Sequence, residues 1–487
     1  MRKMRTSMRV WRVLAMLAAM VVAWLEGRAA SHGIQFFRSQ HGVASTMVKG
    51  LPFDLNDTRN LRWRSDSPPG HSTPLVMGNQ IVVTGFDMSR RRLVVNSFDR
   101  QTGGKRWEWE VPEVPLETVH HTTGGVAQPS PATDGERVFV LFGSYGLVAL
   151  DAGGRLLWER RMGPFQDEYG AGSSPVIAGG MVVVQQDHDT DSFLAAYDRK
   201  TGHERWRTSR PDAVRSYSTP VIWERGGKPE LLVAGALELA GYDLKTGEKQ
   251  WWTLGLARIV IPVPVPSQDR IYMASWAPGG DAGRRIALED WTAAVGKWDR
   301  DGDGRLARGE IGNPEVLDRF FRMDLDQNGW LERKEWERHA AVFQSARNAL
   351  LALRPSVSRG ELPASDLLWS HPRGVPYVAS PLVDQGVLWM VKDGGIVTQI
   401  EAAGGTMLRE ERLPGMGAYY ASPVAADGKV YFSSEQGVVT VMANEPGWRL
   451  LGSRDFKEKI YATPVASESG LLIRTVRALY SFKAAVN

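Results

Sequence analysis

Short apolar runs separated by turn residues recur along most of the chain. Residues 181–185 and 429–433 are typical: each has the length of one strand, follows a glycine and is rich in β-branched or aromatic residues. Such runs predict a body made of many short strands and turns rather than long helices.

A Ser-Pro or Thr-Pro step, usually followed by an aliphatic pair, marks the start of each repeated unit. Successive prolines lie 57, 44, 45, 44, 117, 42 and 41 residues apart. A period in the low forties is typical of a four-stranded propeller blade. The steps are Thr73-Pro74, Ser130-Pro131, Ser174-Pro175, Thr219-Pro220, the degenerate Val263-Pro264, Ser380-Pro381, Ser422-Pro423 and Thr463-Pro464. Eight starts predict eight blades.

A second recurring segment combines a tight turn with a tryptophan. Residues 197–206 read YDRKTGHERW, and residues 242–251, 98–107 and, more loosely, 150–158 match them. The Asp-x-x-Thr-Gly part predicts a hairpin turn, because glycine adopts positive φ and Asp or Thr bonds the turn backbone. The tryptophan then lies on the next strand, where its ring can pack between adjacent sheets. Each unit therefore reads as strand, strand, turn, strand.

The two ends of the repeat region predict how the ring closes. The last unit supplies only three strands, the final one at 478–482, whereas an orphan strand at 60–66 precedes the first proline and carries Trp63 at the place of the unit-ending tryptophan. Pairing the orphan strand with the last unit would close the ring without an exposed sheet edge. We therefore expect an all-β fold, an eight-bladed β-propeller of four-stranded blades closed by the N- and C-terminal strands.

Composition agrees with this fold class and excludes some chemistry. The 487 residues include 51 glycines, 27 prolines and 18 tryptophans, more than a helical bundle uses. The chain has no cysteine, which excludes disulfides, thiolate chemistry and a lipid attached to an N-terminal cysteine. The ring must therefore be held together by burial of its core.

Residues 1–29 have the three-part layout of a signal peptide. Basic residues are followed by an apolar run at 13–25 and by small residues at Ala29 and Ala30, where cleavage is expected. Cleavage removes six basic residues and one acidic residue, so the formal net charge of +4 becomes −1 for residues 30–487, which removes the charge argument for nucleic-acid binding. We expect a periplasmic or secreted monomer without a membrane anchor. An uncleaved anchor is the alternative, although the apolar run is short for a membrane span.

The 117-residue spacing between Pro264 and Pro381 contains a segment that does not follow the repeat. Residues 299–310 (DRDGDGRLARGE) and 324–335 (DLDQNGWLERKE) carry oxygen-bearing side chains at positions 1, 3, 5 and 12 and glycine at position 6. This is the EF-hand pattern, which gathers oxygen ligands for Ca²⁺ around a sharp bend. The predicted ligands are Asp299, Asp301, Asp303, Glu310 and the carbonyl of Arg305 at one site, and Asp324, Asp326, Asn328, Glu335 and the carbonyl of Trp330 at a second, with Glu332 acting directly or through water.

The flanking residues predict a small helical module around the two loops. Asn313 can cap a helix that starts with Pro314 and runs to about Met323. Leu306 and Leu331, at position 8 of their loops, resemble residues that join paired loops through a short bridge.

The module is expected at residues 281–346, inserted in the fifth blade. Residues 348–354 and 366–369 read as the third and fourth strands of that blade, so the insertion follows its second strand. The alternative to two calcium sites is a pair of acidic surface turns that bind nothing. A structural role for calcium is favoured over a regulatory one, because an exported protein meets calcium at high and nearly constant levels.

Polar and aromatic residues gather where the innermost strands are expected to begin, at the mouth of the central channel. His71, Tyr217, Tyr420 and Tyr461 each lie three residues before a proline of the repeat, and we take them as candidate cofactor- or ligand-binding residues. A small anionic or aromatic ligand would need such groups. The alternative is that they bond neighbouring backbone and plug the ring. Nearby are His120, His121, Asp187, His188, Arg215 and Tyr377.

The units resemble the pyrroloquinoline-quinone-type (PQQ-like) propeller repeat, in which Ala-x-Asp-x-x-Thr-Gly-x-x-x-Trp is the tryptophan docking motif. The resemblance covers most of residues 33–487 except the insertion. It is closest to exported bacterial propellers that carry an EF-hand insertion, which the strings at 36–38 and 143–147 also fit. It implies the fold strongly and the function weakly, because the same scaffold serves dehydrogenases and non-catalytic proteins.

Two kinds of function are compatible with this resemblance. In the first, the protein is a binding or assembly scaffold for a protein, peptide or glycan. In the second, it is a PQQ-dependent dehydrogenase that oxidises alcohols or sugars, with the quinone held against a Ca²⁺ and an Asp as general base. The adjacent cysteine pair of many such enzymes and a haem attachment sequence are both excluded, and the family's cofactor Ca²⁺ ligands and catalytic Asp cannot be assigned residue by residue in this sequence. We therefore favour the binding role and assign no catalytic residue.

Overall fold

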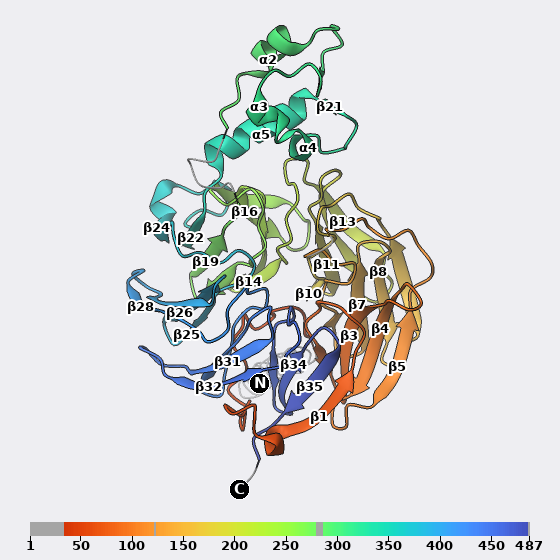
Figure 1. Cartoon of the computed structure of the whole chain (residues 1–487), viewed down its shortest axis with the longest axis vertical. Helices are drawn as coiled ribbons and strands as arrows, with labels where there is room; N and C mark the ends of the chain where they lie inside the picture. The colour runs from red at the N-terminus through yellow and green to blue at the C-terminus, as the bar shows by residue number, and fades with distance from the viewer. Residues whose placement is uncertain (1–33, 121–122, 279–285, 486–487) are drawn as a thin grey trace, which may run out of the picture.

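The computed structural model describes residues 34–120, 123–278 and 286–485, which form an eight-bladed β-propeller (Figure 1). Each blade is an antiparallel sheet of four consecutive strands, except at the closure and at the insertion. The predicted signal peptide lies outside the described residues. No helix within the described ranges combines the length and the apolar character that crossing a membrane requires.

The first four blades follow the chain in order. Blade 1 contains β2 (Leu75–Met77), β3 (Gln80–Asp87), β4 (Arg92–Asp99) and β5 (Lys105–Glu110). Blade 2 contains β6 (Ala132–Thr133), β7 (Arg137–Phe142), β8 (Gly146–Asp151) and β9 (Leu156–Arg161). Blade 3 contains β10 (Val176–Ala178), β11 (Met181–Gln186), β12 (Phe193–Asp198) and β13 (Glu204–Ser209). Blade 4 contains β14 (Val221–Arg225), β15 (Lys228–Gly235), β16 (Glu238–Asp243) and β17 (Lys249–Leu254).

The remaining blades include the insertion and the closure. Blade 5 contains β18 (Val265–Ser267), β19 (Arg270–Ser275), β22 (Ala349–Leu353) and β24 (Leu367–His371). Blade 6 contains β25 (Leu382–Asp384), β26 (Val387–Lys392), β27 (Ile396–Glu401) and β28 (Met407–Arg412). Blade 7 contains β29 (Val424–Ala426), β30 (Lys429–Ser433), β31 (Val438–Ala443) and β32 (Leu450–Asp455). Blade 8 contains β33 (Val465–Ser467), β34 (Gly470–Arg474), β35 (Ala478–Phe482) and β1 (Leu61–Asp66).

The predicted closure of the ring is confirmed. Strand β1 pairs antiparallel with β35, with Asp66 opposite Ala478 and Leu61 opposite Phe482. The strand begins one residue later than expected, because Asn60 ends a short 3-10 helix, η1 (Thr58–Asn60). The first and last described strands of the propeller therefore share one sheet, which leaves no free edge at the seam.

The Ser/Thr-Pro steps form a chain of hydrogen bonds between neighbouring blades. The backbone N–H of Ser130 donates to Oγ of Ser174 at 2.9 Å, and the N–H of Ser174 donates to Oγ1 of Thr219 at 3.0 Å. At the degenerate step, Val263 still donates its N–H to Oγ of Ser380. Having no hydroxyl, Val263 cannot accept such a bond in turn. The repeated hydroxyl residue therefore joins blades 1 to 4 to one another and blades 5 to 8 to one another.

Tryptophans of the docking motif join the blades at the outer strands. Trp206 of β13 donates its Nε1–H to the carbonyl of Leu244 in the following blade at 3.0 Å, and its ring covers Gly247 of the turn. Trp158 makes the equivalent bond to the carbonyl of Arg199. A glycine is required beneath each ring, because a Cβ at Gly247 would lie 2.3 Å from the ring of Trp206.

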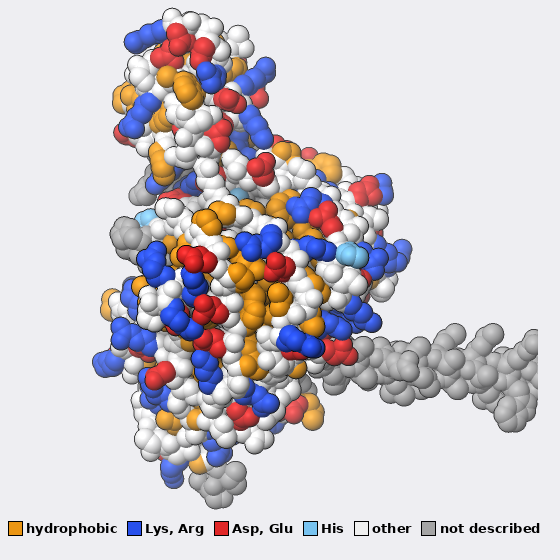
Figure 2. Space-filling view, turned by 90° about the vertical axis from the view of Figure 1, so that its right-hand side faces the viewer, with side chains coloured by type: hydrophobic (Ala, Val, Ile, Leu, Met, Phe, Trp, Pro, Cys, Tyr) orange, Lys and Arg blue, Asp and Glu red, His pale blue; other side chains and the backbone are white. Residues whose placement is uncertain are grey.

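The insertion occupies the predicted place, between the second and third strands of blade 5. Its helices are α2 (Trp291–Trp298), α3 (Pro314–Leu317), α4 (Phe320–Met323) and α5 (Arg333–Ser345). They form a lobe that projects beyond the propeller (Figure 2) and has its own small core, which includes Trp298, Trp336 and Phe320. Two details differ from expectation. The helix expected from 314 to about 323 is divided into α3 and α4 by a turn at Asp318 and Arg319, where Arg319 has φ −110° and ψ −1°. A short strand, β23 (Gly360–Glu361), adds to blade 4 parallel to β17.

The segment that precedes β1 crosses the ring. Gln35 pairs with Thr133 of blade 2, and Val43 pairs with Ala425 of blade 7. Between them, the buried guanidinium of Arg38 donates to the carbonyls of Pro381 and Pro423, at 2.5 and 3.4 Å. This crossing segment links blades that are far apart in the sequence and closes part of the central channel.

Candidate functional site

A cavity of about 330 Å³ lies on the propeller axis, where the blades converge. Its wall carries the hydroxyls of the Ser/Thr-Pro steps, and its mouth carries aromatic rings from the loops that lead into the innermost strands. Among the residues that line it are Phe37, His71, Thr123, Gln128, Tyr169, Tyr217, Ile261, Tyr377, Tyr420 and Tyr461. The four candidate residues from the sequence therefore do line one cavity, together with Tyr377.

The aromatic rings at the mouth contact one another. The ring centroids of His71 and Tyr461 lie 4.2 Å apart, those of Tyr420 and Tyr461 5.3 Å apart, and those of Tyr169 and Tyr217 5.9 Å apart. These contacts hold the rings in a fixed arrangement. Apolar ring surface and hydroxyl groups thus stand side by side around the opening.

The described residues of the cavity wall are uncharged at neutral pH. Burial lowers the pKa of His71 to about 4, and it raises the pKa of Tyr377 and of Tyr420 to about 12. The described residues that line the cavity include no Asp, Glu, Lys or Arg. The expectation of an anionic ligand at this site is therefore not supported by its charge, whereas a neutral ligand with hydroxyl or aromatic groups is compatible with it.

Two of the mouth tyrosines already have hydrogen-bonded hydroxyls: Tyr461 donates to Oε1 of Glu435 at 3.2 Å, and Tyr217 bonds to a buried carboxylate. Tyr217 is 8% exposed and donates to Oδ1 of Asp167 at 2.6 Å. Oδ2 of the same carboxylate lies 3.1 Å from Nδ1 of His188, and the ring of Phe165 stacks on the imidazole with centroids 3.9 Å apart. The Tyr217 hydroxyl is therefore occupied within the protein, as the alternative expected, although its partner is a carboxylate side chain rather than backbone.

The other residues near the predicted mouth have different positions. His188 lies in the buried network behind the wall, and Asp187 pairs with the buried Arg210, with Nε to Oδ1 at 2.8 Å. Arg215 pairs with Glu168 and Asp189. His120 contacts Tyr169 but is not part of the lining. His121 lies outside the described residues.

Phe37, Tyr169, Thr123 and Gln128 were missed by the sequence analysis. Phe37 reaches the cavity from the crossing segment, which has no repeat pattern, and Tyr169 does not lie at the offset of three residues from a proline. A search of the whole loop before each step would have found Tyr169. Nothing in the local sequence marks Phe37 as a lining residue.

In both acidic loops, the first aspartate accepts hydrogen bonds from backbone N–H groups further along the loop, including that of the glycine at position 6. Asp299 accepts from the N–H of Gly302 and Gly304, and Asp324 accepts from the N–H of Asn328 and Gly329. The predicted bridge is present, because β20 (Leu306–Ala307) and β21 (Trp330–Leu331) pair with Leu306 opposite Leu331. The two loops are therefore joined at position 8.

Within each loop, three carboxylates converge. Oxygen atoms of Asp299, Asp301 and Asp303 all lie within 4.8 Å of one another, and so do those of Asp324, Asp326 and Glu335. Burial, with repulsion from Asp326 among the smaller causes, raises the pKa of Asp324 and of Glu335. Such repulsion between hard oxygen ligands is what a bound divalent cation would relieve.

The other predicted side-chain ligands are not among these groups of converging carboxylates. Glu310 lies outside the first group and accepts from the N–H of Arg300 and Ala307, at 2.9 and 2.8 Å. The amide of Asn328 donates to Asp326 at 2.8 Å, and the side chain of Arg305 pairs with Asp303. The residues fit calcium in their chemistry, while binding itself and the two carbonyl ligands remain predictions.

Comparison with known proteins agrees with the repeat and the fold. A family model for the outer membrane protein assembly factor BamB matches residues 90–259. The structure of BamB from Moraxella catarrhalis is similar at 12% identity and a TM-score of 0.55, covering 87% of this chain and 99% of that one. A europium-containing methanol dehydrogenase is similar at 11% identity and a TM-score of 0.57, covering 93% and 98%. No curated protein sequence matches the chain.

The eight four-stranded blades define a β-propeller protein, and its residues 90–259 are similar to the PQQ-like repeats of the matched family model. This confirms the resemblance drawn from the docking motif. A BamB protein and a dehydrogenase share the fold, so the fold alone does not decide between binding and catalysis. That decision depends on the residues of the site.

Proposed function

We propose that this protein is an exported, non-catalytic binding propeller whose central cavity accepts a neutral, hydroxyl-rich group, such as the end of a glycan. The observation that carries the proposal is the cavity wall, which combines aromatic rings with hydroxyls and is uncharged along its described residues. Sugars present apolar faces that pack on aromatic rings and hydroxyls that exchange hydrogen bonds with Ser, Thr and Gln. The cavity volume of about 330 Å³ lies at the lower end of the range of small-molecule sites.

The quinone alternative does not fit this cavity. Pyrroloquinoline quinone carries several carboxylates, so its site needs cationic partners or a metal held by carboxylates. The described lining offers neither. The chain also lacks the cysteines found beside the quinone in many alcohol-oxidising relatives. These observations support the binding role over a dehydrogenase.

Two further parts of the proposal concern calcium and partners. The acidic loops bind two Ca²⁺ ions, with a structural role in the inserted lobe, as the convergence of their carboxylates supports. The matched family model describes an assembly factor, and a similar role would present the loops around the cavity to a protein, peptide or glycan partner. Export to the periplasm or beyond rests on the layout of residues 1–29.

Calorimetric titration with neutral oligosaccharides, maltotriose and chitotriose, tests the cavity. We expect binding by the wild type and at least a tenfold loss in a Tyr420→Ala/Tyr461→Ala double variant, because the variant removes two rings of the mouth. Phe53→Ala is the control, since Phe53 is 51% exposed and does not line the cavity.

A parallel assay adds pyrroloquinoline quinone and Ca²⁺ and follows dye-linked oxidation of alcohols and sugars. No turnover above a protein-free blank is expected. Quinone-dependent turnover that the double variant abolishes would overturn the proposal, and so would oligosaccharide binding that is the same in all three proteins.

A further inference from the structure

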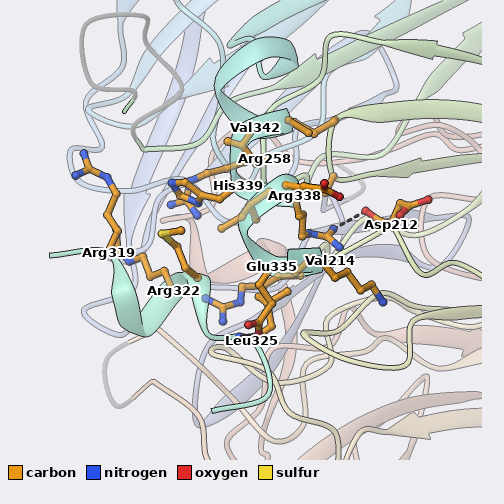
Figure 3. Close-up of a pocket in the computed structure, with 18 of the residues that line it drawn as sticks. Asp212, Val214, Arg258, Arg319, Arg322, Leu325, Glu335, Arg338, His339 and Val342 are labelled. Carbon is orange, nitrogen blue, oxygen red and sulfur yellow. Dashed lines mark hydrogen bonds between the residues drawn. The ribbon is translucent and has the colours of Figure 1, made fainter. Parts of the chain in front are cut away.

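A second, larger cavity lies at the junction between the inserted lobe and the propeller. It has a volume of about 910 Å³, and α4 and α5 form one wall while loops of blades 3 to 5 form the other (Figure 3). The lobe is held there by hydrogen bonds. Arg338 donates to the carbonyls of Pro211 and Asp212, and the N–H of Arg347 donates to the carbonyl of Leu256 at 3.1 Å.

The cavity is strongly cationic. Seven arginine and lysine side chains line it, against three carboxylates. Some of these cationic side chains form ion pairs: Arg215 is paired with Glu168 and Asp189, and Arg333 is paired with Glu337 at 2.8 Å. Others do not. Within the described part of the chain, neither Arg258 nor Arg322 forms an ion pair with a carboxylate.

The basic side chains that line the cavity lie close enough to shift one another's pKa. Arg258 comes from the propeller, whereas Arg319, Arg322 and His339 come from the inserted helices (Figure 3). Burial lowers the pKa of Arg258, with a further contribution from Arg322. Burial, followed by the charges of Arg258 and Arg319, lowers the pKa of His339 to about 4. Holding like charges together in a partly buried cavity costs free energy that a bound anion would offset.

We propose that this junction cavity is a binding site for a small polyanion that carries phosphate or carboxylate groups, with Arg258 and Arg322 as its principal ligands. Guanidinium groups suit both chemistries, because their planar N–H donors match the oxygens of either anion. The site draws one ligand from the propeller and one from the lobe, so a bound anion would also tie the lobe to the ring. It is separate from the neutral axial cavity, although Pro278 lines both.

Calorimetric titrations at low ionic strength with two probes, pyrophosphate and citrate, test the site and distinguish the two anion chemistries. Binding of at least one probe by the full mature chain is expected, with an affinity that falls as salt is added. Arg258→Gln and Arg322→Gln should each weaken it about tenfold or more. Arg258→Lys, which keeps a charge, should retain more affinity than Arg258→Gln. Arg322 is exposed, so its substitution leaves the packing of the core intact.

The matched control is Arg62→Gln, which makes the same change in net charge at an exposed position of β1, outside the cavity. It should bind the probes as the wild type does. Failure of both probes to bind at millimolar concentration would overturn the proposal. An equal loss in Arg62→Gln would also overturn it, because the effect would then come from overall charge. The circular dichroism spectrum of each variant shows whether it folds.

Discussion

Substitution of Gly247 tests whether the docking of tryptophan on the neighbouring blade stabilises the ring. Gly247 has φ of +72°, and a Cβ there would lie 2.3 Å from the ring of Trp206, which is 8% exposed. Gly180 is a matched control, since its φ is +79° and a Cβ would meet nothing within 4 Å. Gly180→Ala therefore measures the backbone penalty alone, about 1 kcal/mol.

Gly247→Ala adds the displacement of a buried indole to the same penalty. Deleting a buried large aromatic side chain costs about 3–5 kcal/mol, so we expect a total loss of about 3 kcal/mol or more. Urea denaturation followed by far-ultraviolet circular dichroism measures both variants. In a Trp206→Ala background, Gly247→Ala should cost only about as much as Gly180→Ala, because the ring is gone. Equal losses for the two glycine variants in the wild-type background would refute the importance of the ring contact.

Three further perturbations have defined outcomes. Glu310→Gln with Glu335→Gln should strongly weaken calcium binding in a calorimetric titration while the β signal of the propeller stays unchanged, since no blade strand includes either residue; loss of the β signal would contradict this. Burial raises the pKa of Glu117 to about 7, so the folded protein holds its proton more tightly than the unfolded chain. Stability should therefore fall as pH rises from about 4.5 to 7, by about 3 kcal/mol at most, and Glu117→Gln should reduce this dependence in thermal unfolding at pH 5 and pH 8. Deleting residues 61–66 should lower the unfolding midpoint, because β35 would lose its outer partner, and an unchanged midpoint would argue against the closure.

The blades could be predicted from the sequence because each depends on residues close together in the chain. The Asp-x-x-Thr-Gly turn forms within five residues, and Asp198 indeed accepts from the N–H of Lys200 and Thr201. The acidic loops are likewise contiguous, so their bridge at Leu306 and Leu331 followed from position alone. The length of the α3 and α4 segment was not predictable in the same way, because the break at Arg319 has no glycine or proline to mark it.

The candidate sites show the limit of such local patterns. The offset of three residues from a proline correctly predicted that His71, Tyr420 and Tyr461 line the axial cavity. It could not show that the hydroxyl of Tyr217 donates to Asp167, which lies 50 residues away in the sequence. The absence of charge along the described lining also became visible only when all eight blades were brought to one axis. The net charge of the cavity lining is therefore a property of the assembled ring rather than of any single repeat.

The sequence by itself determined the number of blades, their closure by the terminal strands and the place of the insertion, because a repeat with a constant period can bury its apolar faces only by stacking copies of itself. Only the tertiary structure decided which residues line the axial cavity and which line the cavity between the inserted lobe and the propeller. Arg258 and Arg322 are 64 residues apart and share a cavity only because α4 and α5 dock on the loops of the propeller. Contacts between such distant residues depend on the packing of whole elements, which no local pattern encodes.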